Sequence, residues 1–148
     1  MRKFYEVKEE FKKIGGETKL PTRATKGSCA YDFYAKADYE VYPNQIVKIW
    51  TDVKAQMESD EALLINVRSS MGGKWELINE QGWIDFDYYS NIKNDGNIGI
   101  FLRNVSENIQ KINRDDRIAQ GMFIKYLVTD DDEPLSEIRE GGFGSSGK

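Results

Sequence analysis

The sequence predicts an all-β fold, a jelly-roll-like barrel or sandwich of short antiparallel strands. Three observations lead to this prediction. Apolar residues recur at period two more often than at helical spacing, aromatic residues make up 12% of the chain and favour strands, and turn-forming residues separate the alternating segments. Many short strands with few helical segments are typical of barrels and sandwiches.

The alternating segments give the predicted strands in order: 47–55, 63–67, 98–102 and 122–128. Turn residues lie between them, at Pro43-Asn44, Ser59-Asp60, Gly72-Gly73, Asp95-Gly96 and 113–116. Only the segment Lys3–Ile14 has helical apolar spacing, and its first residues fit a strand equally well. We see no repeat and no linker, so residues 1–138 are predicted to form a single β-barrel domain.

The C-terminal part of the chain differs in composition from the rest. Residues 129–137 contain five acidic residues and a proline, and predict a solvated arm. The last eight residues, GGFGSSGK, contain four glycines, two serines and one aromatic residue, Phe143. Such a segment fits either a disordered end or a loop that closes over a flat, charged ligand. We therefore expect a flexible segment over residues 139–148.

Composition excludes several functional classes. The net charge of −4 and the lack of a basic run argue against binding to polymeric nucleic acid, although a nucleotide remains possible. No apolar stretch has the length of a signal peptide or a membrane span, so we expect a cytoplasmic protein without a membrane partner. With one cysteine and no histidine, zinc sites and Ser-His or Cys-His pairs are excluded. Acid–base chemistry is expected to fall to carboxylates, or else to lysine or tyrosine.

The stretch GWIDFDYY, residues 82–89, is the first candidate site. Asp85 and Asp87 are two residues apart and would share a face of a strand. Ile84 and Tyr88 flank Asp85, and a carboxylate among such neighbours can take a proton from water or anchor a metal. The alternative is that both aspartates cap a turn.

Three shorter stretches are further candidates. Arg68 is followed by Ser69 and Ser70 at the end of a predicted strand, where they could hold phosphate oxygens, although such triplets are common by chance. Arg117 opens another strand, in the stretch RIAQ, and could equally pair with a buried acid. Asp32 lies among apolar and aromatic residues, a setting that usually requires a charged or hydrogen-bonding partner.

Taken in order, the stretches AYD, RSS, GWIDFDY, RIAQ and GGFGSSG make the chain similar to the trimeric deoxyuridine triphosphatase (dUTPase) family. The resemblance extends from about Leu20 to Lys148. It implies hydrolysis of dUTP to dUMP and pyrophosphate with Mg²⁺, and a homotrimer whose composite sites are each assembled from three chains.

The resemblance also implies roles for single residues. Asp85 would activate the attacking water, and Tyr88 would pack beneath the deoxyribose and leave no room for a 2′-hydroxyl. Asp32 would contact the water shell of the metal, and Arg117 would support the acidic site. The uracil would be read by Asn79 and the hairpin main chain around Gly82 and Ile84, and the phosphates would be held by Arg68, Ser69, Ser70 and Gln120.

By the same resemblance the tail is a lid that crosses to a neighbouring chain. Phe143 would stack on the uracil, while Gly144, Ser145 and Ser146 would wrap the β- and γ-phosphates. Arg139 would reach the γ-phosphate. Closing such a lid costs conformational entropy, which only a correct triphosphate would offset.

The chain departs from the family pattern at three points. Ala30 replaces the usual glycine before Tyr31, Arg139 is one residue closer to the paired glycines than usual, and the hairpin after Tyr88 is lengthened by YSNIKND. Two alternatives remain: a dCTP deaminase of the same fold, which would need an acid directed at the base, and a nucleotide-sensing or partner-binding module that keeps the pocket without turnover.

Overall fold

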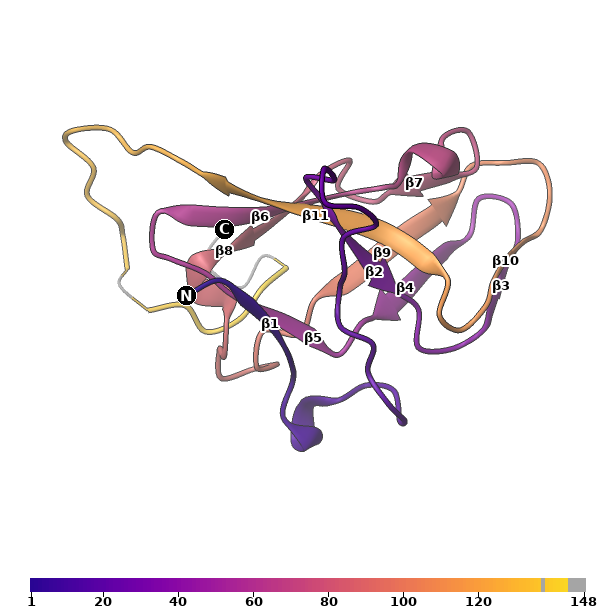
Figure 1. Ribbon diagram of the computed structural model, residues 1–148, viewed down its shortest axis with the longest axis horizontal. Coiled ribbons are helices and arrows are strands. Elements are labelled where there is room, and N and C mark those ends of the chain that lie inside the picture. Colours follow the sequence, from indigo (N-terminus) through magenta and orange to yellow (C-terminus); the bar gives the residue numbers. More distant parts are fainter. Residues whose placement is uncertain (137, 144–148) are drawn as a thin grey trace.

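The computed structural model describes residues 1–136 and 138–143, and its regular secondary structure is almost entirely β-strand (Figure 1). Three short 3₁₀ helices interrupt the strands: η1 (Glu9–Phe11), η2 (Ser69–Met71) and η3 (Phe86–Tyr88). The strands are β1 (Lys3–Glu6), β2 (Tyr31–Tyr34), β3 (Tyr39–Val41), β4 (Ile46–Trp50), β5 (Val53–Gln56), β6 (Glu61–Asn66), β7 (Trp75–Leu77), β8 (Gly82–Asp85), β9 (Gly99–Asn104), β10 (Gln110–Ile112) and β11 (Arg117–Lys125). The all-β prediction is confirmed.

The strands form two main antiparallel sheets and two shorter pairs. One sheet has the order β2-β11-β6-β8 and the other β4-β9-β7, while β1 pairs with β5 and β10 with β3. In Figure 1 the first sheet lies across the top of the molecule and the second descends on the right. The enclosed core is apolar, and its fully buried large side chains include Phe33, Ile49, Leu63, Ile65, Ile98, Ile100, Leu102 and Ile118.

The predicted strands 63–67 and 98–102 correspond to β6 and β9 with limits shifted by one or two residues, whereas the other two differ more. The alternating run 47–55 is two strands, β4 and β5, because the chain turns at Asp52, whose φ is +55°. Of the run 122–128, only residues 122–125 lie in a strand, the later part of β11, which begins at Arg117 and ends at Lys125. Its core-facing side includes the fully buried Ala119, while Met122 and Ile124 are only half-buried. The segment Lys3–Ile14, for which a helix and a strand were both possible, begins as the strand β1 and continues into the single helical turn η1.

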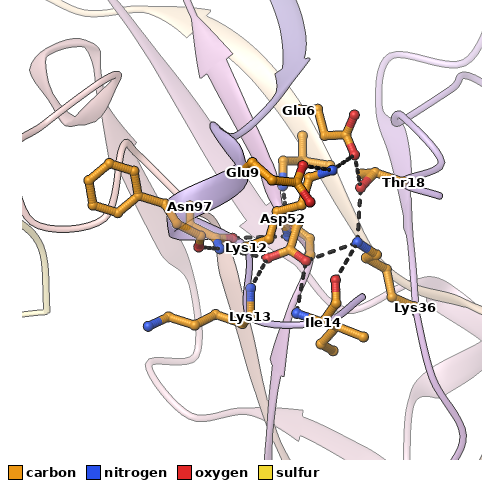
Figure 2. Close-up of polar contacts among 12 residues, drawn as sticks. Glu6, Glu9, Lys12, Lys13, Ile14, Thr18, Lys36, Asp52 and Asn97 are labelled. Carbon is orange, nitrogen blue, oxygen red and sulfur yellow. Dashed lines mark hydrogen bonds and ion pairs between the residues drawn. The ribbon is translucent and has the colours of Figure 1, made fainter. Parts of the chain in front are cut away.

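A buried ion pair between Lys36 and Asp52 holds the N-terminal segment against the barrel (Figure 2). The Lys36 Nζ lies 2.9 Å from the Asp52 Oδ2, and their side chains are 3% and 0% exposed. Asp52 also accepts hydrogen bonds from the backbone N–H groups of Lys13 and Ile14 and from the Asn97 amide. A buried charge is tolerated only when it is paired in this way, so the network fixes where residues 8–18 run.

Tight turns join the strands at the predicted positions. Asn44, Asp95 and Asp115 have φ of +65°, +58° and +70°, a conformation that Asn and Asp adopt more readily than most residues.

No helix among residues 1–136 and 138–143 is long and apolar enough to cross a membrane.

Candidate active site

The predicted nucleoside-binding residues come together in one pocket of about 140 Å³. It lies between the β7–β8 hairpin, β9 and the tail, and its lining includes Asn79, Gly82, Ile84, Asp85 and Tyr88. Pocket residues that sequence reasoning missed include Ile65, Leu77, Gly99 and Phe101. Phe101 could have been noticed, because it occupies the β9 face opposite to the core residues Ile100 and Leu102.

The backbone passes from a strand to a 3₁₀ helix between Asp85 and Tyr88, and this segment forms a wall of the pocket. Strand β8 ends at Asp85, and η3 then turns Tyr88 into the protein, where it is 5% exposed. The expectation that Asp85 and Asp87 share a strand face is therefore wrong, because Asp87 lies in η3. Both carboxylates nevertheless bind one guanidinium: Arg139 Nη2 lies 2.6 Å from Asp85 Oδ2, and Arg139 Nε lies 2.5 Å from Asp87 Oδ1.

Tyr88 is held by hydrogen bonds at both ends. Its hydroxyl donates to the Asn97 carbonyl oxygen at 2.6 Å and accepts from Asn94 Nδ2 at 2.8 Å. Its own carbonyl oxygen accepts from Asn91 Nδ2 at 2.8 Å. Burial raises the pKa of the Tyr88 hydroxyl above its ordinary value, although the hydrogen bond from Asn94 and the charge of Arg139 oppose the shift. Tyr88 therefore stays a neutral, fixed ring.

The predicted phosphate-binding residues form a second cluster around Asp32. The Asp32 carboxylate is nearly buried on β2, with Arg68 Nε 3.0 Å from Oδ1 and Arg117 Nη1 3.5 Å from Oδ2. This confirms that Asp32 has charged partners and that Arg117 pairs with an acid. Gln120 lies opposite Asp32 in the β11–β2 ladder, and the exposed Ser69 and Ser70 begin η2 directly after Arg68.

Asp85 and the cluster around Asp32 lie toward opposite ends of β6. Asp85 pairs with Ala62 near the start of β6, whereas Asn66, the last residue of β6, pairs with Gln120. Arg68 follows Ala62 by six positions, which amounts to roughly 20 Å of extended chain. The carboxylate of the pocket and the arginines of the second cluster are thus separated along the sheet in one chain.

The described part of the tail covers the pocket of its own chain. The Phe143 ring stacks on Phe101 with centroids 4.8 Å apart and contacts Trp50 edge-on at 5.8 Å. A Cβ on Gly142 would lie 2.5 Å from Tyr88 Cε2, so only glycine lets the tail backbone lie against this ring. The predicted lid residues Gly144, Ser145 and Ser146 lie outside the described residues.

A larger groove of about 590 Å³ lies elsewhere, between β1, β11 and the loop before β2. Three of its four basic side chains are already engaged: Arg2 binds Glu61, Lys125 binds Asp60, and Arg23 binds backbone carbonyls of its own loop. We therefore place the chemistry in the smaller pocket, where a carboxylate, aromatic rings and the tail converge.

The barrel carries an aromatic pocket with one carboxylate and, apart from it, two arginines beside one acid. These are groups that a protein binding a nucleoside phosphate can use, the pocket for the base and sugar and the guanidinium groups for phosphate oxygens. The model of the dUTPase family matches residues 16–147. The chain belongs to the dUTPase family.

Several relatives resemble the chain over nearly their whole length. It is 38% identical to the deoxyuridine 5′-triphosphate nucleotidohydrolase of Lactococcus lactis subsp. lactis (strain IL1403), with 97% of this chain and 96% of the relative covered. It is 34% identical to the protein of the same name from Haemophilus influenzae (strain PittEE), with 92% of each covered.

Solved structures show the same fold. The crystal structure of dUTPase from Streptococcus mutans has 32% sequence identity and a TM-score of 0.75, over 86% of this chain and 98% of that one. The dUTPase of Staphylococcus bacteriophage 80alpha with dUPNHPP has 22% identity and a TM-score of 0.69, with 100% of this chain and 99% of that one covered. A mutant dUTPase from phage phi11 of S. aureus, described with a structural Mg(II) ion, has 18% identity and a TM-score of 0.70, with 92% of this chain and 97% of that one covered.

Proposed function

We propose that the protein hydrolyses dUTP to dUMP and pyrophosphate. The observation that carries this proposal is the pocket that joins the Asp85 carboxylate to the Tyr88 ring and the β7–β8 hairpin. The relatives named above, which carry the corresponding activity in their names, support it. The reaction would keep uracil out of DNA and supply dUMP for dTMP synthesis. Because its substrate belongs to the nucleotide pool of the cell, we place the protein in the cytoplasm.

The chemistry requires one water, one base and neutralisation of phosphate charge. The Asp85 carboxylate accepts a proton from the water, whose oxygen forms a bond to the α-phosphorus. The bond between the α-phosphorus and its bridging oxygen breaks, and pyrophosphate leaves with that oxygen. Arg139 binds Asp85 Oδ2, so the guanidinium has to leave this oxygen before Asp85 can use it as a base. A triphosphate is a strong alternative partner for the guanidinium.

Selectivity arises at two places in the pocket. The Tyr88 ring lies beneath the deoxyribose and excludes a 2′-hydroxyl, because its buried, doubly hydrogen-bonded ring has no room to retreat. Asn79 and the main chain near Gly82 and Ile84 read the uracil edge. Gly82 lies close to Ile65, where a Cβ would be 3.0 Å from the Ile65 Cβ, which fixes the strand position at that edge.

The surroundings of Asp32 suit a contact with Mg²⁺ through a water molecule of the ion. Among residues 1–136 and 138–143, no group of three or more His, Cys, Asp or Glu side chains could hold a metal ion. Because Mg²⁺ is commonly held by substrate phosphates together with one or two carboxylates and waters, the triphosphate would supply direct ligands. Each Asp32 oxygen faces one guanidinium, and a carboxylate has capacity for further hydrogen bonds, so Asp32 can accept one from a metal-bound water. When bound, the ion neutralises phosphate charge.

Pyrophosphate release with Mg²⁺ tests the proposed function directly. We expect release from dUTP and far slower release from dCTP, dTTP and UTP, with dUMP as the nucleotide product. Ammonia release from dCTP would instead favour a deaminase. Tight dUTP binding without any release would favour a sensing module.

We further propose a homotrimer in which each site combines the pocket of one chain with the Asp32 cluster of another. The separation of Asp85 from the Asp32 cluster along β6 supports this proposal. So does the exposure of Leu127, Val128 and Ile138 in the segment after β11, which leaves the barrel on the left of Figure 1.

Subunit mixing provides the test of the composite site. Asp85→Asn and Arg68→Ala trimers should each be nearly inactive. In trimers assembled at random from equal amounts of both chains, about a quarter of the sites would combine an intact Asp85 with an intact Arg68. We expect activity to recover toward that fraction. If mixed assemblies stay as inactive as the parents, each site is built within one chain.

The tail is proposed to act as a lid, with Phe143 moving from Phe101 to the uracil when substrate binds. Phe143→Ala should raise KM for dUTP about tenfold, because a stacking partner is worth on the order of 1–3 kcal/mol. The thermal midpoint should change little, since Phe143 is 57% exposed. Normal steady-state kinetics in this variant would exclude the lid.

A further inference from the structure

We propose that the loop 89–97 is a brace for Tyr88, and that Asn94 is the positioning residue through which it sets selectivity against ribonucleotides. The inference rests on the proposed role of Tyr88 beneath the sugar. It assigns a function to the lengthening of the hairpin after Tyr88, which the proposed chemistry does not use.

The loop is folded back on Tyr88 by its own asparagine side chains. Asn94 Nδ2 donates to the Tyr88 hydroxyl at 2.8 Å, and Asn91 Nδ2 donates both to the Tyr88 carbonyl oxygen at 2.8 Å and to Asn94 Oδ1 at 2.7 Å. Asn94 Oδ1 also accepts the Gly96 N–H at 3.0 Å. The amide of Asn94 is therefore oriented by the loop at one end and contacts the ring hydroxyl at the other.

Glycine at position 96 permits this close approach. Its φ is +84°, and a Cβ there would lie 2.8 Å from the Tyr88 carbonyl oxygen and 3.0 Å from the Ser90 N. A side chain would thus push the loop away from Tyr88. The loop conformation and the ring position are coupled through direct contact.

The far side of the loop is anchored to the barrel by buried charge. Asp95 is 1% exposed and binds Lys54 Nζ at 2.8 Å and the Lys8 N–H at 2.8 Å. Asn97, whose carbonyl oxygen accepts the Tyr88 hydroxyl, donates its amide to Asp52 in the network of Figure 2. The loop thus connects Tyr88 to two rigid ion pairs, so Asn94 presents a fixed donor to the hydroxyl.

A ring held only from one side could tilt and admit a 2′-hydroxyl. Without the Asn94 donor, the Tyr88 hydroxyl keeps a single partner, the Asn97 carbonyl. Loss of one hydrogen bond to a buried group corresponds to a factor of about 3 to 10 in an equilibrium. We expect this factor to appear in the ratio of kcat/KM for dUTP to kcat/KM for UTP, mainly as a gain for UTP.

The experiment measures this ratio in the full-length protein. Both substrates are assayed on the same sample, so the ratio is independent of the fraction of folded enzyme. Asn94→Ala should lower the ratio about three- to tenfold. Asn94→Asp keeps the Oδ1 acceptor but removes the donor, and should lower the ratio as well. The control is Ile92→Ala, a change at a 77% exposed side chain in the same loop, which should leave the ratio unchanged.

A Tyr88→Phe background separates a specific brace from general loop damage. If Asn94 acts through the hydroxyl, Asn94→Ala should have no further effect on the ratio there. An additional loss in that background would overturn the inference, as would an unchanged ratio in both Asn94 variants while Tyr88→Ala collapses it. If Tyr88→Ala itself leaves the ratio intact, the role of Tyr88 in the proposed function fails, and the brace fails with it.

Discussion

Replacing Asp85 with asparagine is expected to lower kcat for dUTP about a thousandfold, because a positioned general base contributes roughly 10²- to 10⁴-fold. Asparagine has nearly the same shape but cannot accept the proton of the attacking water. Binding should be retained, since removal of a negative charge beside the triphosphate lowers repulsion. Pyrophosphate release gives kcat, and calorimetry with an α,β-imido analogue of dUTP gives Kd.

Asp87→Asn is the matched control for this variant. Both carboxylates bind Arg139, but among the described residues the pocket lining includes Asp85 and leaves out Asp87. We therefore expect Asp87→Asn to retain most of the turnover. Equal losses in the two variants would show that the shared Arg139 contact matters more than proton transfer. Substantial turnover in Asp85→Asn would remove Asp85 from the role of base.

Asp52→Asn is expected to lower the free energy of unfolding by about 3–5 kcal/mol, the usual cost of removing one partner of a buried ion pair. The substitution leaves the Lys36 ammonium buried without a counter-charge. Asparagine tolerates the positive φ at this position, so the backbone adds little to the effect. Denaturant unfolding at one fixed protein concentration measures the change.

Asp60→Asn is the control for this second effect. The Lys125–Asp60 pair has the same 2.9 Å separation as Lys36–Asp52, but its side chains are 72% and 53% exposed. An exposed pair contributes about 0–1 kcal/mol, so this variant should unfold nearly as the parent does. Similar losses in the two variants would mean that burial does not determine the cost.

The pH dependence of unfolding tests the same pair. Burial alone would raise the pKa of Asp52, but hydrogen bonds from the Lys13 N–H, Lys36, Asn97 and the Ile14 N–H outweigh it, and the pKa is lowered from 3.8. Its contribution to stability is therefore complete above pH 3.8 and is lost as the pH falls through the lowered value. Below pH 4 the parent should lose stability more steeply than Asp52→Asn. Parallel curves would contradict the shift.

Sequence by itself determined the fold class and proposed the candidate residues of the site. Period-two alternation and turn chemistry require no partner at a distance, so they predicted an antiparallel β fold and the positions of its turns. The absence of histidine restricted acid–base chemistry to other side chains. The order of short motifs led to Asp85, Tyr88, Arg68 and Asp32, although each motif is weak when taken alone.

Only the tertiary structure decided which of these residues lie together. Pairing of β6 with β8 and β11 places Asp85 and Arg68 toward opposite ends of one strand, which spacing along the chain cannot show. The break at Asp52 and the brace around Tyr88 depend on contacts between residues far apart in sequence, such as Lys8 with Asp95 and Asn97 with Asp52. The local sequence pattern indicates only the propensity of a segment to form a strand or a turn. Burial and long-range hydrogen bonds arise only when distant segments pack together.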